Sequence, residues 1–89
     1  MDANRGKAIL AEVFKLVDDI RHFDTNVREQ SIVMKHTTDN LQDAWDDPQY
    51  DQFANYMSEL IKSLESDLDI LQEANDDLER RAKIIAGDY

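Results

Sequence analysis

The chain has 89 residues, with 10 lysines and arginines against 20 aspartates and glutamates, a formal net charge of −10 and no cysteine. So short a chain forms one domain with little core, and without thiols it has neither disulfides nor thiolate metal sites. The acidic balance predicts repulsion from nucleic acids and from anionic membranes.

Charged residues interrupt the first 20 residues at short intervals, from Asp2 to Asp19. A signal peptide or a membrane span needs a continuous apolar stretch, so we expect no membrane insertion. The expected location is the cytoplasm, with export by a signal-peptide-independent route as the alternative.

The first long helix is predicted from about residue 5 to residue 44. Its apolar residues recur every seven positions, as expected for one face of a long helix. Asn4 is the predicted N-cap, because its side chain can accept from the free amides of the first turn. The residues of this apolar stripe are Val13, Val17, Ile20, Phe23, Val27, Met34 and Leu41.

A turn at 45–47 is predicted to end this helix. Pro48 cannot continue a helix but suits the first position of a new one, and it favours an extended conformation at the residue before it. Asp47 is therefore the predicted N-cap of the second helix. Trp45, the only tryptophan, is expected to pack at the closed end of the hairpin, or to line a groove for a partner.

The second helix is predicted from about residue 48 to residue 86. Gly87 is expected to end it in the left-handed conformation that glycine adopts easily. Its apolar stripe repeats every seven residues as well. The residues of the stripe are Tyr50, Phe53, Met57, Leu60, Ile61, Leu64, Leu68, Leu71, Leu78 and Ile85.

The two stripes match each other when the chain reverses at the turn. Paired residues then have numbers that sum to about 95, which places Val27 opposite Leu68 and Ile20 opposite Ala74. The fold class is therefore all-α, an antiparallel helical hairpin, with a continuous rod opened at Pro48 as the alternative within an assembly.

A single seam cannot cover the wide apolar stripe of the first helix. We expect the hairpin to dimerise into a four-helix bundle, with itself or with a similar small helical protein. Polar residues near the middle of the seam could fix the register or the dimer orientation. These residues are Asp24, Gln30, Ser31, Asp67 and Asn75.

No group of residues points to catalysis, a cofactor or a metal. Asp18 and His22 have the spacing of two ligands on one helix side, but two ligands do not make a metal site. Adjacent acidic pairs such as Asp76-Asp77 point in different directions around a helix, so they cannot act as an acid and a base on one substrate. We expect the protein not to be an enzyme.

The residues around the turn resemble the WXG100 or ESAT-6-like family, whose members are short helical hairpins joined by a Trp-X-Gly turn. Trp45 matches the family tryptophan and Phe53 the aromatic residue that follows it. Asp47 stands where the family has glycine, and no tyrosine here is followed four residues later by an acid, as in the family export signal.

The resemblance implies a non-enzymatic protein that forms homo- or heterodimers and serves as a substrate of a type VII secretion system or as the partner of a toxin. A secretion ATPase would then be a further partner. The alternative is a coiled-coil adaptor or assembly subunit in the cytoplasm, which agrees with the missing export signal.

Overall fold

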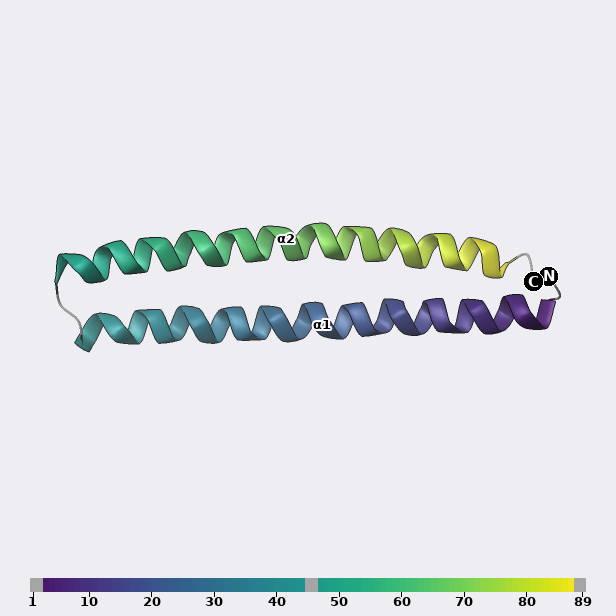
Figure 1. Ribbon diagram of the computed structural model, residues 1–89, viewed down its shortest axis with the longest axis horizontal. Helices are drawn as coiled ribbons and strands as arrows, with labels where there is room; N and C mark the ends of the chain where they lie inside the picture. Colours follow the sequence, from purple (N-terminus) through teal and green to yellow (C-terminus); the bar gives the residue numbers. More distant parts are fainter. Residues whose placement is uncertain (1–2, 45–46, 88–89) are drawn as a thin grey trace.

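The computed structural model describes residues 3–44 and 47–87, which form two long helices lying side by side (Figure 1). Helix α1 spans Ala3–Ala44 and helix α2 spans Pro48–Ala86. They run in opposite directions, and the molecule measures 67 × 16 × 15 Å. The predicted antiparallel hairpin is confirmed, and Trp45 lies outside the described residues.

The start of α2 follows the prediction from the Asp-Pro sequence. Asp47 is extended, with φ −154° and ψ 168°, and its Oδ1 accepts from the amides of Gln49 at 2.8 Å and Tyr50 at 3.2 Å. Pro48 opens the helix, where its missing N–H costs nothing. Asp51 adds a negative charge in the first turn, next to the positive end of the helix dipole.

Two predictions about helix ends are wrong. α1 already begins at Ala3, so Asn4 lies within its first turn and not before it. Gly87 has φ −64° and ψ −19°, a right-handed conformation, and its amide continues the helical pattern by donating to the carbonyl of Lys83 at 3.1 Å. The end of α2 therefore needs no left-handed residue.

The seam between the helices is a row of residues at seven-residue intervals on each side. The α1 row consists of Leu10, Val17, Asp24, Ser31 and Thr38, which are buried or half-buried; the α2 row consists of Ala54, Ile61, Leu68, Asn75 and Ala82, of which all but the half-buried Ala54 are buried. Val17, Ile61 and Leu68 of these rows were among the residues predicted for the seam. Each row lies three residues before the main seven-residue apolar series of its helix, which we call its ladder: Val13, Ile20, Val27, Met34 and Leu41 in α1, and Met57, Leu64, Leu71, Leu78 and Ile85 in α2. The ladders therefore flank the line of closest contact, where they are only partly covered.

Contacts across the seam agree with the predicted register. Ser31 donates to Glu65 at 3.2 Å and the amide of Asn75 donates to the carbonyl of Val17 at 3.0 Å. The numbers in each of these pairs sum to within a few of 95. One detail differs, because Asn75 enters the seam and the adjacent Ala74, the predicted partner of Ile20, is exposed.

Candidate interaction surface

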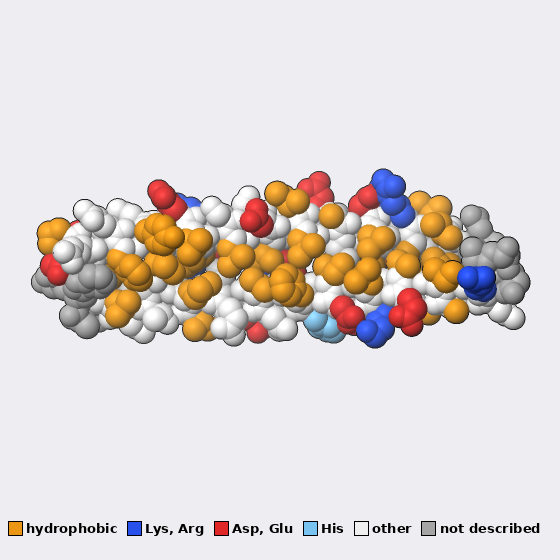
Figure 2. Space-filling model, viewed as in Figure 1, with side chains coloured by type: hydrophobic (Ala, Val, Ile, Leu, Met, Phe, Trp, Pro, Cys, Tyr) orange, Lys and Arg blue, Asp and Glu red, His pale blue; other side chains and the backbone are white. Residues whose placement is uncertain are grey.

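One side of the hairpin is apolar along both helices, and we call it the apolar face. In each helix it consists of the row three residues after the seam row and the row one residue before the seam row. Because the helices are antiparallel, these rows of α1 and α2 lie on the same side of the hairpin. Figure 2 shows it as a band of hydrophobic side chains that follows the line between the helices. Its members are Ile9, Val13, Leu16, Ile20, Phe23, Val27, Met34 and Leu41 of α1, and Phe53, Met57, Leu60, Leu64, Leu71, Leu78 and Ile85 of α2.

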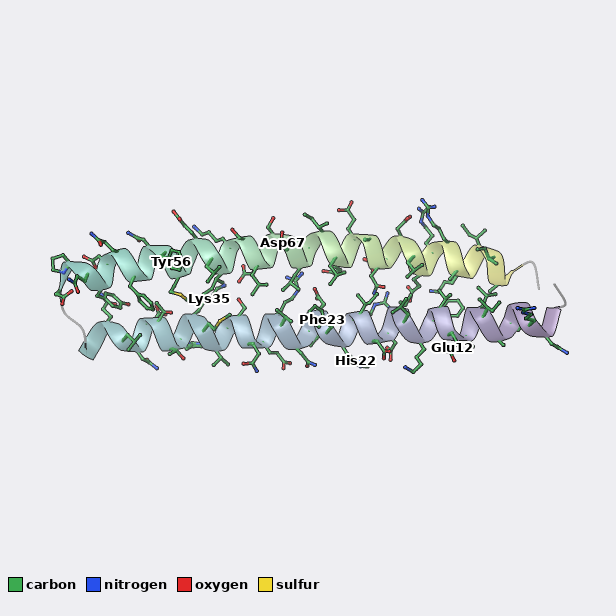
Figure 3. The ribbon with its side chains drawn as sticks, in the orientation of Figure 1. Glu12, His22, Phe23, Lys35, Tyr56 and Asp67 are labelled. Carbon is green, nitrogen blue, oxygen red and sulfur yellow. The ribbon has the colours of Figure 1, made fainter. Side chains whose placement is uncertain are left out.

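The outer part of the apolar face is open to solvent. Leu16 is 51% exposed, Phe23 55% and Leu60 50%, which is unusual for large apolar side chains that lie close together. Figure 3 labels Phe23 on the visible side of α1, whereas Glu12 and His22 lie along its outer edge. The hairpin therefore presents a long apolar strip that its own two helices do not cover.

The predicted seam residues and Phe53 divide into three groups by burial. The buried ones form part of the seam or close its end near the turn: Val17, Tyr50, Ile61 and Leu68. The half-buried ones flank the seam: Val13, Ile20, Val27, Met34, Phe53, Met57, Leu64, Leu71 and Leu78. The exposed ones, which make no part of the seam of this hairpin, are Phe23, Leu41, Leu60 and Ile85. The role of this last group in a dimer stays a prediction.

The opposite side, which we call the ion-paired face, joins basic residues of α1 to acidic residues of α2. Arg21 contacts Glu79 at 2.7 Å and Asp76 at 3.4 Å, while Lys35 contacts Glu65 at 2.5 Å. Arg28 bridges Asp24 on its own helix and Asp69 on α2, both at 2.8 Å. The basic residues stand four residues after the seam row, on the side away from the ladder.

These pairs shift the ionisation of their members. The hydrogen bond from Arg21, with its charge, lowers the pKa of Glu79, and the hydrogen bond from Lys35 lowers the pKa of Glu65, helped by the hydroxyl of Ser31. The carboxylates raise the pKa of Arg21 in turn. Each exposed ion pair stabilises the folded hairpin only weakly. Together, however, these pairs give the charged side chains along the middle of this face partners within the same chain.

Sequence analysis missed the ion-paired face. Arg21, Arg28 and Lys35 recur at seven-residue intervals, and the numbers of Arg28 and Asp69 sum to 97, close to the sum of about 95 in the predicted register. Applying the register to charged residues as well as apolar ones would have indicated acidic residues of the second helix near these basic ones.

The middle of the seam is polar, and three of the five polar residues predicted there lie in it. Ser31 is 1% exposed and Asn75 3%, and Asp24 also lies in the seam row. Gln30 and Asp67, the other two residues predicted there, are exposed and take no part in it.

The hairpin is more extended, and exposes more surface, than a compact chain of its length. Its radius of gyration is 20.1 Å, against about 12 Å for a compact chain of this length. Its accessible surface is 6845 Å², whereas a compact monomer of this mass exposes about 5,400 Å². The excess of roughly 1,500 Å² exceeds the ~800 Å² that each partner contributes to a standard protein interface.

Among residues 3–44 and 47–87, no helix combines the length and the apolar character that a membrane span requires. The same residues include no group of three or more histidine, cysteine or acidic side chains placed to hold a metal ion. Comparisons of the chain with models of protein families, with curated proteins and with solved structures find no match.

Proposed function

We propose that this protein is a non-enzymatic association module whose apolar face binds a second copy of the same chain, so that two hairpins form a four-helix bundle. The single observation that carries the proposal is the uncovered apolar strip, with Leu16, Phe23 and Leu60 each about half exposed. Burying a large apolar side chain stabilises an interface by about 1.5–3 kcal/mol. A strip of this length therefore supplies a large driving force.

A second copy fits this face better than a charged partner does. The outermost row of the face in each helix, which lies one residue before the seam row, carries few charges. The two charged residues of this row in α2, Asp67 and Arg81, have opposite signs. Apart from Asp24 in the seam, the other acidic residues of the part that the structure describes lie on the ion-paired face or on the outer sides, where water and salt separate them from the other copy. The surface excess of one hairpin is also larger than the ~800 Å² that each partner contributes to a standard interface, so the hairpin has enough surface for one.

The resemblance of the turn residues to the WXG100 family supports a role in an exported pair, as a type VII-like secretion substrate or the partner of a toxin. An adaptor without export is the other candidate, favoured by the lack of an acid four residues after any tyrosine. Detection of the protein in the culture filtrate of cells that do not lyse would support the exported pair. Its retention in washed cells would support the adaptor.

Light scattering during size-exclusion chromatography, with circular dichroism of the same peak, tests the association. We expect a helical species of twice the 10.3 kDa chain mass. Phe23→Asp should shift it toward monomer by at least tenfold in dissociation constant, because a buried charge without a partner is costly. Ile32→Asp is the matched control, since Ile32 is also 53% exposed but lies on the side of Thr25 and Asp39, away from the apolar face.

A helical monomer at all concentrations would contradict self-association. A poorly helical monomer that folds only when a different helical protein is added would show that the face binds a heterologous partner. Equal dissociation constants for the two variants would show that association uses another surface.

A further inference from the structure

The two ends of the hairpin are packed to different degrees along the seam. Near the turn the seam rows contain Thr38 of α1 and Ala54 of α2, both small and only half-buried. Toward the other end, which we call the open end (Figure 1), the seam rows contain Val17, Asn75 and Ala82, which are 2%, 3% and 3% exposed. Because Thr38 and Ala54 bury less apolar surface between them, the helices are held together less firmly near the turn.

A cavity of about 350 Å³ lies beside this part of the seam. Its lining includes Thr38 of α1 and the apolar side chains of Ala54 and Met57 of α2. Side chains that border a cavity lack packing partners on that side, so they contribute less to holding the two helices together. Of the pairs on the ion-paired face, Lys35 with Glu65 is the nearest to the turn, and both residues line the same cavity. That series of ion pairs therefore ends at the cavity.

A hydrogen bond between the helices closes the seam near the turn. The hydroxyl of Tyr50 donates to the backbone carbonyl of Thr38 at 2.8 Å, and Tyr50 is 6% exposed. The hydroxyl of Thr38 donates to the carbonyl of Met34 within α1 at 2.9 Å, so its single proton is not available to α2. A threonine that bonds back along its own helix in this way slightly destabilises the helix. Closure at the turn therefore depends in part on the bond from Tyr50.

We propose that the turn end of the hairpin, residues 38–42 of α1 and 47–57 of α2, opens locally while the rest of the hairpin stays closed, and that the bond from Tyr50 to Thr38 holds it shut. The opening separates the helices at Thr38 and Ala54, where the packing is weakest. It exposes the seam sides of Ala54 and Met57, and it thereby enlarges the uncovered apolar surface at this end of the molecule. The opening needs only one chain and does not depend on the proposed association.

Amide hydrogen exchange of the full chain, followed by ¹H–¹⁵N NMR at several urea concentrations below the unfolding transition, tests the proposal. Amides 54–58 and 80–84 donate helical hydrogen bonds that lie equally far from the two ends of α2. We expect amides 54–58 to exchange at least about fivefold faster than amides 80–84, with a weaker dependence on urea than amides 66–70 in the middle of the helix. The covalent link at the turn alone would favour the opposite order.

Three variants locate the cause of the opening. Tyr50→Phe removes the hydroxyl and should speed the exchange of amides 54–58 about fivefold, the effect of losing one hydrogen bond. Tyr56→Phe is the matched control, because Tyr56 is 65% exposed, and it should leave the exchange of the same amides within about twofold of the native rate. Ala54→Met places a flexible apolar side chain at the cavity and should slow their exchange.

Three results would overturn the proposal. Amides 54–58 could match the middle of α2 in both rate and urea dependence, which would show that the hairpin opens only as a whole. Tyr50→Phe could leave their exchange unchanged while Ala54→Met fails to slow it. The difference between the two ends could also disappear in the Phe23→Asp chain, which would make it a product of association. We expect the difference to persist in that chain, whether or not the native chain forms a dimer.

Discussion

The two faces of the hairpin differ in whether their side chains find partners on the other helix. On the ion-paired face, basic residues of α1 meet acidic residues of α2, as in the contact of Arg28 with Asp69. On the apolar face, side chains such as Phe23 remain half exposed. The first face is satisfied within one chain, and the second is left partly uncovered by that chain. A seven-residue repeat therefore shows that residues share one side of a helix, but it does not show whether that side packs against the other helix of the same chain.

The largest effect is expected in the seam that both faces share. Leu68 is 4% exposed, and Leu68→Ala should lower the free energy of unfolding by about 2–5 kcal/mol through lost burial and a cavity. Ile70→Ala is the control, since Ile70 is 64% exposed nearby, and it should change stability by less than about 0.5 kcal/mol. Urea unfolding measures both, and similar losses would mean that the seam lies elsewhere.

The next largest effect is expected on self-association, at the part of the apolar face that α2 contributes. Leu60→Asp should weaken self-association by at least tenfold in dissociation constant, because it places a charge in the proposed interface. Ile70→Asp adds the same charge on the outer side of α2 and should leave the dissociation constant within about threefold. Analytical ultracentrifugation gives both values. An unaffected Leu60→Asp would restrict the interface to α1.

A smaller effect is expected at the start of α2, which supports both faces equally. Asp47→Ala removes the side-chain acceptor for the amides of Gln49 and Tyr50 and should cost about 1 kcal/mol. Asp47→Asn should restore most of that loss, because asparagine is an equally good N-cap. Thermal unfolding followed by circular dichroism distinguishes the two. Without such a rescue, the loss would have to come from the charge and not from the cap.

The smallest effect concerns acid and the ion-paired face. Arg21 and Lys35 lower the pKa values of Glu79 and Glu65 below the ordinary glutamate value of 4.5. A lowered folded-state pKa means that these pairs stabilise the hairpin above pH 4.5 and stop doing so as the pH falls through the lower, folded values.

The double variant Glu65→Gln, Glu79→Gln should therefore be less stable than the native chain at pH 7 and equal to it in strong acid. Glu73→Gln changes one charge on the exposed side of α2 and controls for net charge. Stability curves measured at several pH values provide the comparison. A difference that persists in strong acid would show that the glutamates act by packing.

The sequence by itself determined the two helices, the reversal between them and their register. Apolar spacing identifies a helix side, and the Asp47-Pro48 pair fixes a helix start through local geometry alone. Both depend on neighbours within a few residues, so they can be read without the fold. Gly87 shows the limit, because glycine permits a left-handed end but does not require one.

Only the tertiary structure decided which row of each helix lies in the seam. The most apolar row, with Ile20 and Leu71, was the natural choice, yet the central row contains Asp24 and Asn75. In the structure the helices are turned so that the charged rows pair on one side and the apolar rows are partly uncovered on the other. That rotation depends on contacts between residues far apart in the chain, such as Arg21 with Glu79, and it sets which surface remains for a partner.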